Sequence, residues 1–394
     1  MLVAGEPSGD QLASELVHAL RATCPHGTPK FFGAGGPRLA GVGVECLLDL
    51  TQHALIGLPT LGEYFKFRGF RDQLIHLAEE RKPDVFIGVD YFGFNSRLAE
   101  AILKNGSPSN PPRIVQFVSP QVWASRPRRA HRMESTHDLL LSILPFEQTW
   151  YQQQAPGLAV EFVGHPMVDR HNLDLGAGSA NNTTPQPMSP ESQVVLLLPG
   201  SRRGEIARHA PVLLEAATLI AARIPEARFR VIVPNQDLAS LVEPMLPQLP
   251  QITLQLGGLN EALPSAALAL ASTGTVTLEC AWFGVPFIAL YKTSWMTYQI
   301  GKRIIAVKHL AMPNLLAGKT VAPEFIQDQA TPANLAAEAI AILIDPERQR
   351  RMKVELKAVV STLGSPGAVT RAASAIWRLL QPPSQASTGR ITSP

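Results

Sequence analysis

The chain has 394 residues, 45% of them hydrophobic and 17% charged, and this length and balance predict a folded protein of two domains. No apolar run approaches the roughly eighteen residues of a membrane span, and no charged-then-apolar leader opens the sequence, so we expect a cytoplasmic protein. A formal charge of +3 is too small to indicate a nucleic-acid partner, and three widely spaced cysteines support neither a disulfide framework nor a zinc site.

The first half of the chain alternates short apolar runs with helical stretches. A strand at 2–4 leads directly into Gly5-Glu6-Pro7-Ser8-Gly9-Asp10 and a helix that continues to Leu20. Further strands are predicted at 85–89, 113–118 and 139–143. Buried strands that alternate with helices form parallel sheets with right-handed crossovers, so residues 1–171 predict a Rossmann-like domain.

A change in composition marks the middle of the chain. Residues 172–191 are rich in Gly, Ser, Asn, Thr and Pro and have few apolar side chains, which predicts a linker. A second Rossmann-like domain is predicted over 192–366, with strands at 194–198, 229–233, 267–271 and 285–290. We expect the helix at 367–380 to pack back on a domain or a partner chain, and 381–394 to be disordered.

The turn Pro199-Gly200-Ser201-Arg202 lies between the strand at 194–198 and a helix predicted from Glu205 to Arg223. The first N–H groups of a helix have no intrahelical partner, and the helix dipole adds partial positive charge there. Together with the charge of Arg202, these groups predict a binding site for phosphate. The alternative is an ordinary strand–helix turn with a solvated arginine.

A second turn of this kind, Ser272-Thr273-Gly274-Thr275, follows the strand at 267–271. Its hydroxyls, glycine and helix N–H groups suit a diphosphate. Glu279, about one turn deeper in the helix, suits a bidentate hydrogen bond to ribose hydroxyls, although a glutamate there often only complements the helix dipole. Two such turns in one half of the chain favour a nucleotide-binding domain.

Seven short motifs run from residue 5 to about 324. They are Gly5-Glu6-Pro7-Ser8-Gly9-Asp10, Gly35-Gly36-Pro37, Val118-Ser119-Pro120-Gln121-Val122-Trp123-Ala124, Leu144-Pro145-Phe146-Glu147, Gly164-His165-Pro166, Leu198-Pro199-Gly200-Ser201-Arg202 and Pro313-Asn314-Leu315-Leu316. In this order and spacing they resemble the motifs of the lipid-A-disaccharide synthase family. The tryptophan-centred and Leu-Pro-Phe-Glu stretches are highly specific.

The resemblance implies a GT-B fold, in which two Rossmann-like domains face each other across a cleft. It implies an inverting glycosyltransferase that joins UDP-2,3-diacylglucosamine, the donor, to 2,3-diacylglucosamine 1-phosphate, called lipid X, the acceptor. The products are the β-1,6-linked lipid A disaccharide 1-phosphate and UDP. The resemblance further implies no metal and no cofactor, and peripheral association with the inner membrane. Members of the family can form homodimers with exchanged C-terminal segments, and the sequence leaves the oligomeric state of this chain open.

Residue roles follow from the resemblance by position. Asp90 matches the family's essential aspartate and is the candidate general base for the acceptor 6-hydroxyl, although a carboxylate at a strand end also suits a cap of the next helix. The donor residues are expected to be Gly200, Ser201, Arg202, Ser272, Thr273, Gly274, Thr275, Glu279 and Asn314. The acceptor residues are expected to be Glu6, Ser8, Gly9, Asp10, Asn95, Ser119 and Trp123.

Two positions depart from the family pattern. Phe92 stands where the family usually has proline, so the loop after Asp90 lacks proline's fixed φ and is expected to be less rigid. Ser125 stands where the family often has a second tryptophan, which loosens one expected aromatic wall.

The stretch 55–77 interleaves bulky apolar residues with Lys66, Arg68 and Arg71. This pattern suits a helix lying on an anionic bilayer, and equally a helix whose apolar side faces the core. The acylated substrates that the resemblance implies favour the membrane. We therefore expect membrane or acyl-chain contact from Leu61, Phe65, Phe67 and Phe70.

Other functions fit parts of this pattern. A UDP-N-acetylglucosamine 2-epimerase or the muramyl-peptide glycosyltransferase would share the fold but would not explain the tryptophan-centred stretch. A non-catalytic nucleotide-sugar-binding protein would lose nothing on mutation of Asp90. Nucleic-acid binding by Arg126, Arg128 and Arg129 is a weaker alternative, because these charges also suit a solvated helix start.

Overall fold

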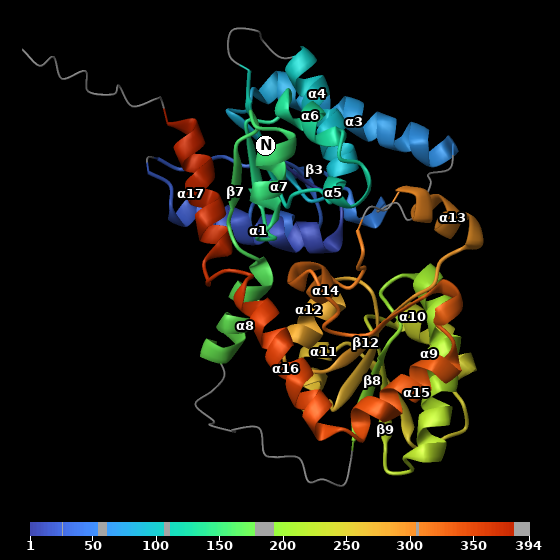
Figure 1. Ribbon diagram of the computed structural model, residues 1–394. Coiled ribbons are helices and arrows are strands. Elements are labelled where there is room, and N and C mark those ends of the chain that lie inside the picture. The colour runs from blue at the N-terminus through green and yellow to red at the C-terminus, as the bar shows by residue number, and fades with distance from the viewer. Residues whose placement is uncertain (26, 54–60, 106–110, 178–192, 305–306, 382–394) are drawn as a thin grey trace, which may run out of the picture. The chain divides into compact units, whose positions relative to one another are not determined.

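Figure 1 shows the computed structural model, which describes residues 1–25, 27–53, 61–105, 111–177, 193–304 and 307–381. The chain divides into two compact units, the first comprising Met1–Ala177 and Leu363–Pro394 and the second Gly178–Thr362. Each unit has its own parallel sheet, so the α/β class is confirmed. Residues 178–191 of the predicted linker and 382–394 of the predicted tail lie outside the described residues.

Seven parallel strands form the first sheet, in the order β3-β2-β1-β4-β5-β6-β7. They are β1 Leu2–Ala4, β2 Phe32–Gly35, β3 Glu45–Asp49, β4 Val85–Val89, β5 Arg113–Phe117, β6 Leu139–Ser142 and β7 Val160–Phe162. The side chains of the central strand β4 pack into cores on both faces of the sheet. Phe86 belongs to the core on one face, and Ile87 and Val89 belong to the core on the other. Burial on both faces explains the continuous apolar run of this strand.

Helices cover both faces of the first sheet. Leu16 of α1 and Ile376 of α17 share a core with Ile87, while Leu74 of α3 and Leu98 of α4 pack on the opposite face. The helices of this unit are α1 Pro7–Ala22, α2 Pro37–Gly41, α3 Leu61–Arg81, α4 Phe92–Asn105, α5 Val122–Ser125, α6 Arg129–Glu134, α7 Glu147–Gln154, α8 Pro166–Ala177 and α17 Ala368–Leu380, with a 3₁₀ turn at Thr51–His53. Helix α8 continues through 172–177, which composition had assigned to the linker.

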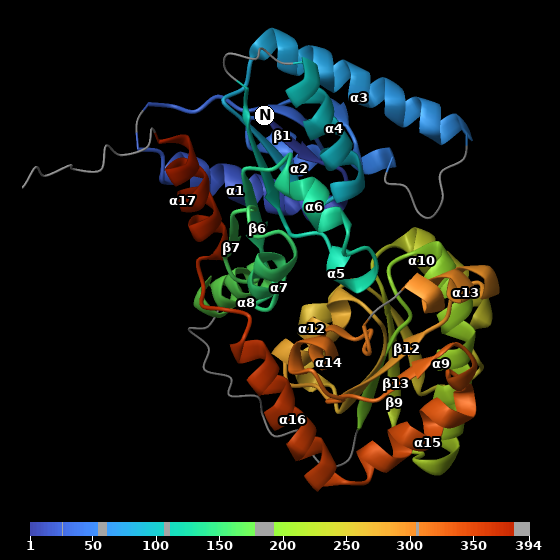
Figure 2. The same cartoon turned by 45° about the horizontal axis from the view of Figure 1, so that its top comes forward.

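The C-terminal helix α17 packs beside α1 of the first unit, as both views show (Figures 1 and 2). Trp377 Nε1 donates a hydrogen bond of 3.2 Å to the carbonyl oxygen of Leu20. At the N-terminal end of α17, the Asp169 carboxylate accepts hydrogen bonds from the N–H groups of Gly367 and Val369. Helix α17 therefore completes the core of the first unit.

The second sheet has six parallel strands in the order β10-β9-β8-β11-β12-β13. They are β8 Val194–Leu198, β9 Arg228–Val233, β10 Ile252–Leu256, β11 Leu268–Ser272, β12 Phe287–Tyr291 and β13 Glu324–Ile326. The helices are α9 Arg203–Arg223, α10 Gln236–Val242, α11 Leu259–Ala262, α12 Thr275–Trp282, α13 Trp295–Ile304, α14 Met312–Ala317, α15 Pro332–Leu343 and α16 Pro346–Ser361, with 3₁₀ turns at Glu243–Met245, Leu263–Ser265 and Gln327–Gln329. Helix α9 packs against α15, and α12 packs against α14 and α16.

Candidate active site

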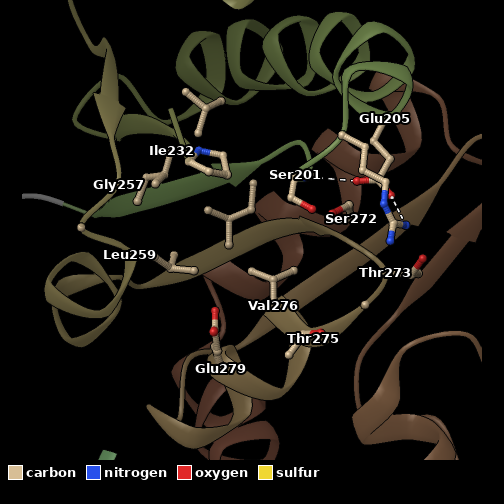
Figure 3. Close-up of a pocket in the computed structure, with 17 residues that line it drawn as sticks. Ser201, Glu205, Ile232, Gly257, Leu259, Ser272, Thr273, Thr275, Val276 and Glu279 are labelled. Atoms are coloured by element: carbon tan, nitrogen blue, oxygen red, sulfur yellow. Dashed lines mark hydrogen bonds and ion pairs between the residues drawn. The ribbon is translucent and has the colours of Figure 1, made fainter. Parts of the chain in front are cut away.

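A pocket of about 610 Å³ opens at the carboxyl ends of β8, β9 and β11 in the second unit (Figure 3). In open parallel sheets this edge is where ligands bind, because the loops that follow the strands converge there. Every predicted donor residue except Asn314 lines the pocket: Gly200, Ser201, Arg202, Ser272, Thr273, Gly274, Thr275 and Glu279. The two predicted turns therefore face one cavity.

The first turn requires a glycine. Gly200 has a φ of +117°, and a Cβ at this position would lie 2.4 Å from Oε2 of Glu205. The same Oε2 accepts a hydrogen bond of 3.1 Å from the N–H of Ser201, and Oε1 lies 3.5 Å from Nη1 of Arg202 (Figure 3). The turn thus already holds a carboxylate with one backbone N–H group and one guanidinium.

A buried histidine of α9 links this turn to the end of β12. His209 Nε2 accepts a hydrogen bond of 3.0 Å from the N–H of Lys292, so its Nδ1 carries the proton and donates to Pro199 O at 2.8 Å. Burial lowers the pKa of His209, which keeps the ring neutral. In a trans peptide the C=O and N–H point in opposite directions, so holding Pro199 O fixes the direction of the Gly200 N–H.

The second turn joins β11 to α12. Gly274 has a φ of +137°, and its carbonyl accepts hydrogen bonds from both the N–H and the hydroxyl of Thr277, at 3.1 and 2.7 Å. Ser272 is buried at the strand end, and Glu279 projects from α12 toward the pocket (Figure 3). Hydroxyls, helix N–H groups and a carboxylate therefore line one wall of the pocket.

Asn314 has a different role from the predicted donor contact. It is fully buried, and its Nδ2 donates to Ala322 O and to Glu324 Oε1, each at 2.7 Å. Its Oδ1 accepts hydrogen bonds from the N–H groups of Val321 and Ala322. These bonds join α14 to the start of β13 and occupy the amide. The prediction is corrected: Asn314 does not line the pocket.

In the first unit, Asp90 follows β4 at the carboxyl edge of the sheet. Its N–H donates to Phe117 O at 2.8 Å, and its φ is +51°. A Cβ at Gly9 would lie 3.6 Å from Cβ of Asp90, and one at Gly5 would overlap the ring of Tyr91. Because neither glycine has a side chain, the predicted acceptor loop approaches the residues that follow β4 closely.

The residues of that loop differ in role. Glu6 is half-buried at the N-cap of α1, and Ser8 is exposed. Asp10 is 2% exposed, and its carboxylate accepts hydrogen bonds from the N–H groups of Gly36, Arg38 and Leu39 at 2.7, 3.0 and 3.1 Å. Since these bonds fix the start of α2, the predicted acceptor role of Asp10 is corrected to a structural one.

Ser119 and Trp123, also predicted to bind the acceptor, belong to a buried network. Trp123 Nε1 donates to Glu147 Oε1 at 3.0 Å, and Ser119 Oγ lies 3.4 Å from the Tyr151 hydroxyl. The prediction for both residues is corrected, because their polar atoms face the interior. Sequence reasoning gave Glu147 no role, although the specific Leu144-Pro145-Phe146-Glu147 motif signalled its importance. That motif and the tryptophan-centred one are two halves of one network.

Glu147 predicts a pH dependence of stability. Its full burial raises its pKa from an ordinary 4.5 to about 7. Between these values the unfolded chain releases a proton that the folded chain keeps, so stability falls as the pH rises from about 4.5 to about 7. Glu147→Gln removes this dependence. Urea unfolding measures this. From pH 5 to pH 8 we expect the free energy of unfolding of wild type to fall relative to that of the variant. A difference between the two proteins that is the same at both pH values would contradict the buried acid.

The predicted contact residues of α3 differ in exposure, and membrane contact by them stays a prediction. Phe65 is 59% exposed, but Phe67 and Phe70 are half-buried, with ring centroids 5.8 Å apart. Phe67 also packs edge-on against Phe94 of α4. The side chain of Leu61 lies outside the described residues. Among the helices that the structure describes, none has the length and apolar character needed to span a bilayer.

Known structures place this fold in a class. The calicheamicin glycosyltransferase CalG4 matches with a TM-score of 0.55 and 14% identity, covering 100% of this chain and 98% of that one. UDP-GlcNAc 2-epimerase from Neisseria meningitidis, bound to UDP-GlcNAc, matches with a TM-score of 0.64 and 13% identity, covering 96% and 98%. Together with the two parallel-sheet units, these matches define a GT-B fold.

The sequence comparisons are more specific. The family model described as lipid-A-disaccharide synthetase matches residues 1–376. Lipid-A-disaccharide synthases from Syntrophus aciditrophicus and Trichlorobacter lovleyi are 37% and 36% identical, over 95% and 97% of both chains. The chain belongs to the lipid-A-disaccharide synthase family. It is therefore a glycosyltransferase of lipid A biosynthesis, and its likeness to the epimerase is one of fold.

Proposed function

We propose that this chain transfers the diacylglucosamine of UDP-2,3-diacylglucosamine to the 6-hydroxyl of lipid X, with inversion, and releases UDP. Family membership supports the reaction. The observation that carries the donor assignment is the pocket of the second unit, where Gly200–Arg202 and Ser272–Thr275 face one cavity that also contains Glu279. Two helix starts and an arginine suit a diphosphate, and a carboxylate suits a ribose.

In this proposal, UDP replaces an internal contact. The diphosphate takes the hydrogen bond that the Ser201 N–H now gives to Glu205, and Arg202 turns from that carboxylate to the phosphate oxygens. His209 keeps the turn in place through Pro199 O. The pocket therefore needs only side-chain movement to accept the nucleotide.

Asp90 of the first unit supplies the base. Its carboxylate takes the proton of the acceptor 6-hydroxyl as that oxygen attacks the anomeric carbon from the face opposite UDP. The bond from the anomeric carbon to the phosphate oxygen breaks, and the electron pair leaves with UDP. Arg202 and the starts of α9 and α12 stabilise the charge that builds on the diphosphate.

The test is direct conversion. Purified protein is incubated with UDP-2,3-diacylglucosamine and lipid X in detergent micelles, and the products are analysed by mass spectrometry. We expect a disaccharide 1-phosphate and one UDP per disaccharide, with a β-1,6 linkage by NMR. Release of UDP without disaccharide, or epimerisation of UDP-N-acetylglucosamine at a comparable rate, would contradict the proposal.

We further propose that the protein binds the inner membrane peripherally through α3. Phe65 is exposed beside Lys66, so a ring can enter the acyl boundary while a cation meets lipid phosphates. Phe65→Ser is expected to lower binding to vesicles with anionic phospholipid about fivefold or more, since full burial of a phenylalanine contributes about 1.5–3 kcal/mol. Sedimentation with the vesicles measures this.

The matched control is Ile344→Ser, which removes a 67% exposed apolar side chain from the second unit. It should leave vesicle binding unchanged, and neither variant should shift the melting temperature by more than a few degrees. Equal binding of the Phe65 variant and wild type would remove α3 from the membrane proposal.

A further inference from the structure

Two buried side-chain amides meet at the backbone carbonyl of Asp90. Asn95 Nδ2 and Gln116 Nε2 each donate a hydrogen bond of 2.9 Å to Asp90 O. Asn95 lies in the first turn of α4 and Gln116 in the neighbouring strand β5, and their exposures are 0% and 1%. Asn95, predicted to contact the acceptor, therefore faces the backbone instead, which corrects that prediction.

The orientation of both amides follows from their surroundings. Asn95 Nδ2 also lies 3.4 Å from Val3 O, and Gln116 Nε2 lies 3.3 Å from both Phe117 O and Val118 O. Carbonyl oxygens only accept hydrogen bonds, so the amide nitrogens must face them. The amide oxygens of Asn95 and Gln116 are then buried with no hydrogen-bond partner in the described structure. Because unpaired buried oxygens lose hydration, stability alone does not explain these two residues.

A glycine in β4 makes room for the amides. A Cβ at Gly88 would lie 2.7 Å from Gln116 Oε1 and 2.9 Å from Asn95 Cβ. Any larger residue at position 88 would displace both side chains. Gly88 of β4, Asn95 of α4 and Gln116 of β5 therefore pack together next to the Asp90 backbone.

Two of the carbonyls that the amides contact belong to strained backbone. Asp90, Tyr91 and Val118 have φ values of +51°, +43° and +69°, a region that residues with a Cβ rarely adopt. Asp90 and Val118 carry two of the carbonyls that Gln116 contacts. Such strain persists only where neighbouring groups hold it, and it is concentrated at functional sites.

We propose that Asn95 and Gln116 are positioning residues, which hold the strained backbone after β4 so that the Asp90 carboxylate is presented for proton transfer. The Asp90 N–H is held by Phe117 O and its C=O by the two amides, so the peptide planes on both sides of its Cα are held, and with them the direction in which the side chain leaves the backbone. This inference rests on the proposed role of Asp90 as the base.

The test is Gln116→Met, which keeps the length of the side chain and removes the donor. We expect kcat to fall about 10- to 100-fold, because small displacements of a catalytic group have effects of this size. The KM for lipid X and the UDP affinity should stay within about twofold of wild type. Gly88→Ala is a second route to the same loss, since it displaces both amides without changing their chemistry.

Gln193→Met is the matched control. Gln193 also has a buried amide oxygen with no hydrogen-bond partner among the described residues, and it donates to a backbone carbonyl, that of Leu343, but it lies in the second unit. Its kcat should equal that of wild type. If Gln116→Met and Gly88→Ala, both folded by circular dichroism and melting temperature, turn over as fast as Gln193→Met, the positioning role is wrong.

A double variant separates this inference from the proposed function. If Gln116 acts through the Asp90 carboxylate, Gln116→Met should cause no further loss in an Asp90→Asn background. Additive losses would show that Gln116 acts elsewhere and would overturn the inference while leaving the base in place. Full turnover by Asp90→Asn alone would instead overturn the proposed base.

Discussion

Replacing Asp90 by asparagine is expected to remove nearly all turnover while leaving the fold and the UDP affinity unchanged. The amide keeps the shape of the side chain but cannot take the proton of the attacking hydroxyl, and a general base contributes about 10²- to 10⁴-fold. The donor pocket is lined by residues of the second unit, so UDP binding has no reason to change. Disaccharide formation gives kcat, and titration calorimetry gives the UDP affinity.

Asp138→Asn is the matched control for this variant. Asp138 precedes β6, at the amino edge of the same sheet, where its carboxylate contacts Arg113 and the N–H of Ile114. The Asp138→Asn variant should be less stable than wild type but should have the same kcat. Turnover by Asp90→Asn within a few-fold of wild type would reject the general base. If the protein only binds nucleotide sugars, the substitution would cause no loss of function.

The central strands of both sheets could be predicted from sequence because they are buried on both faces. Strands such as β4 and β8 show continuous apolar runs. The outer strands β3, β7, β10 and β13 were missed, because most of their residues are only half-buried and no such run marks them. Strand β2, Phe32–Gly35, was missed because half of it is glycine.

The two turns that line the pocket were predictable for a related reason. A strand followed by glycine, hydroxyl residues and a helix determines its own geometry within about ten residues, and both turns line the pocket. The direction of a buried polar side chain is set by distant partners instead. Asp10 bonds to the start of α2, and Trp123 bonds to Glu147 of α7. A motif shows that such residues matter but not whether they face a ligand or the backbone.

Arg202→Ala is expected to weaken UDP binding about 10- to 100-fold. Hydrogen bonds to charged groups contribute about 1.5–3 kcal/mol, and each 1.4 kcal/mol corresponds to about tenfold in affinity. The guanidinium is partly exposed at the pocket, so we expect the lower part of this range. The affinity for lipid X should change much less, because Arg202 lies in the donor pocket. Calorimetry with UDP and with lipid X measures both.

Replacing the neighbouring Arg203 tests whether Arg202 acts by direct contact with UDP or only through its positive charge. Arg203 is also exposed and begins α9, but it does not line the pocket, so Arg203→Ala lowers the net charge equally without removing the contact. We expect it to alter UDP affinity by less than about twofold at 0.15 M salt, where screening weakens the effect of an exposed charge that does not contact the ligand. Arg202→Lys should recover only part of the loss, since an ammonium group cannot bind two phosphate oxygens in the planar geometry of a guanidinium. Unchanged UDP affinity in Arg202→Ala would reduce the Pro199–Arg202 turn to a structural connection between β8 and α9.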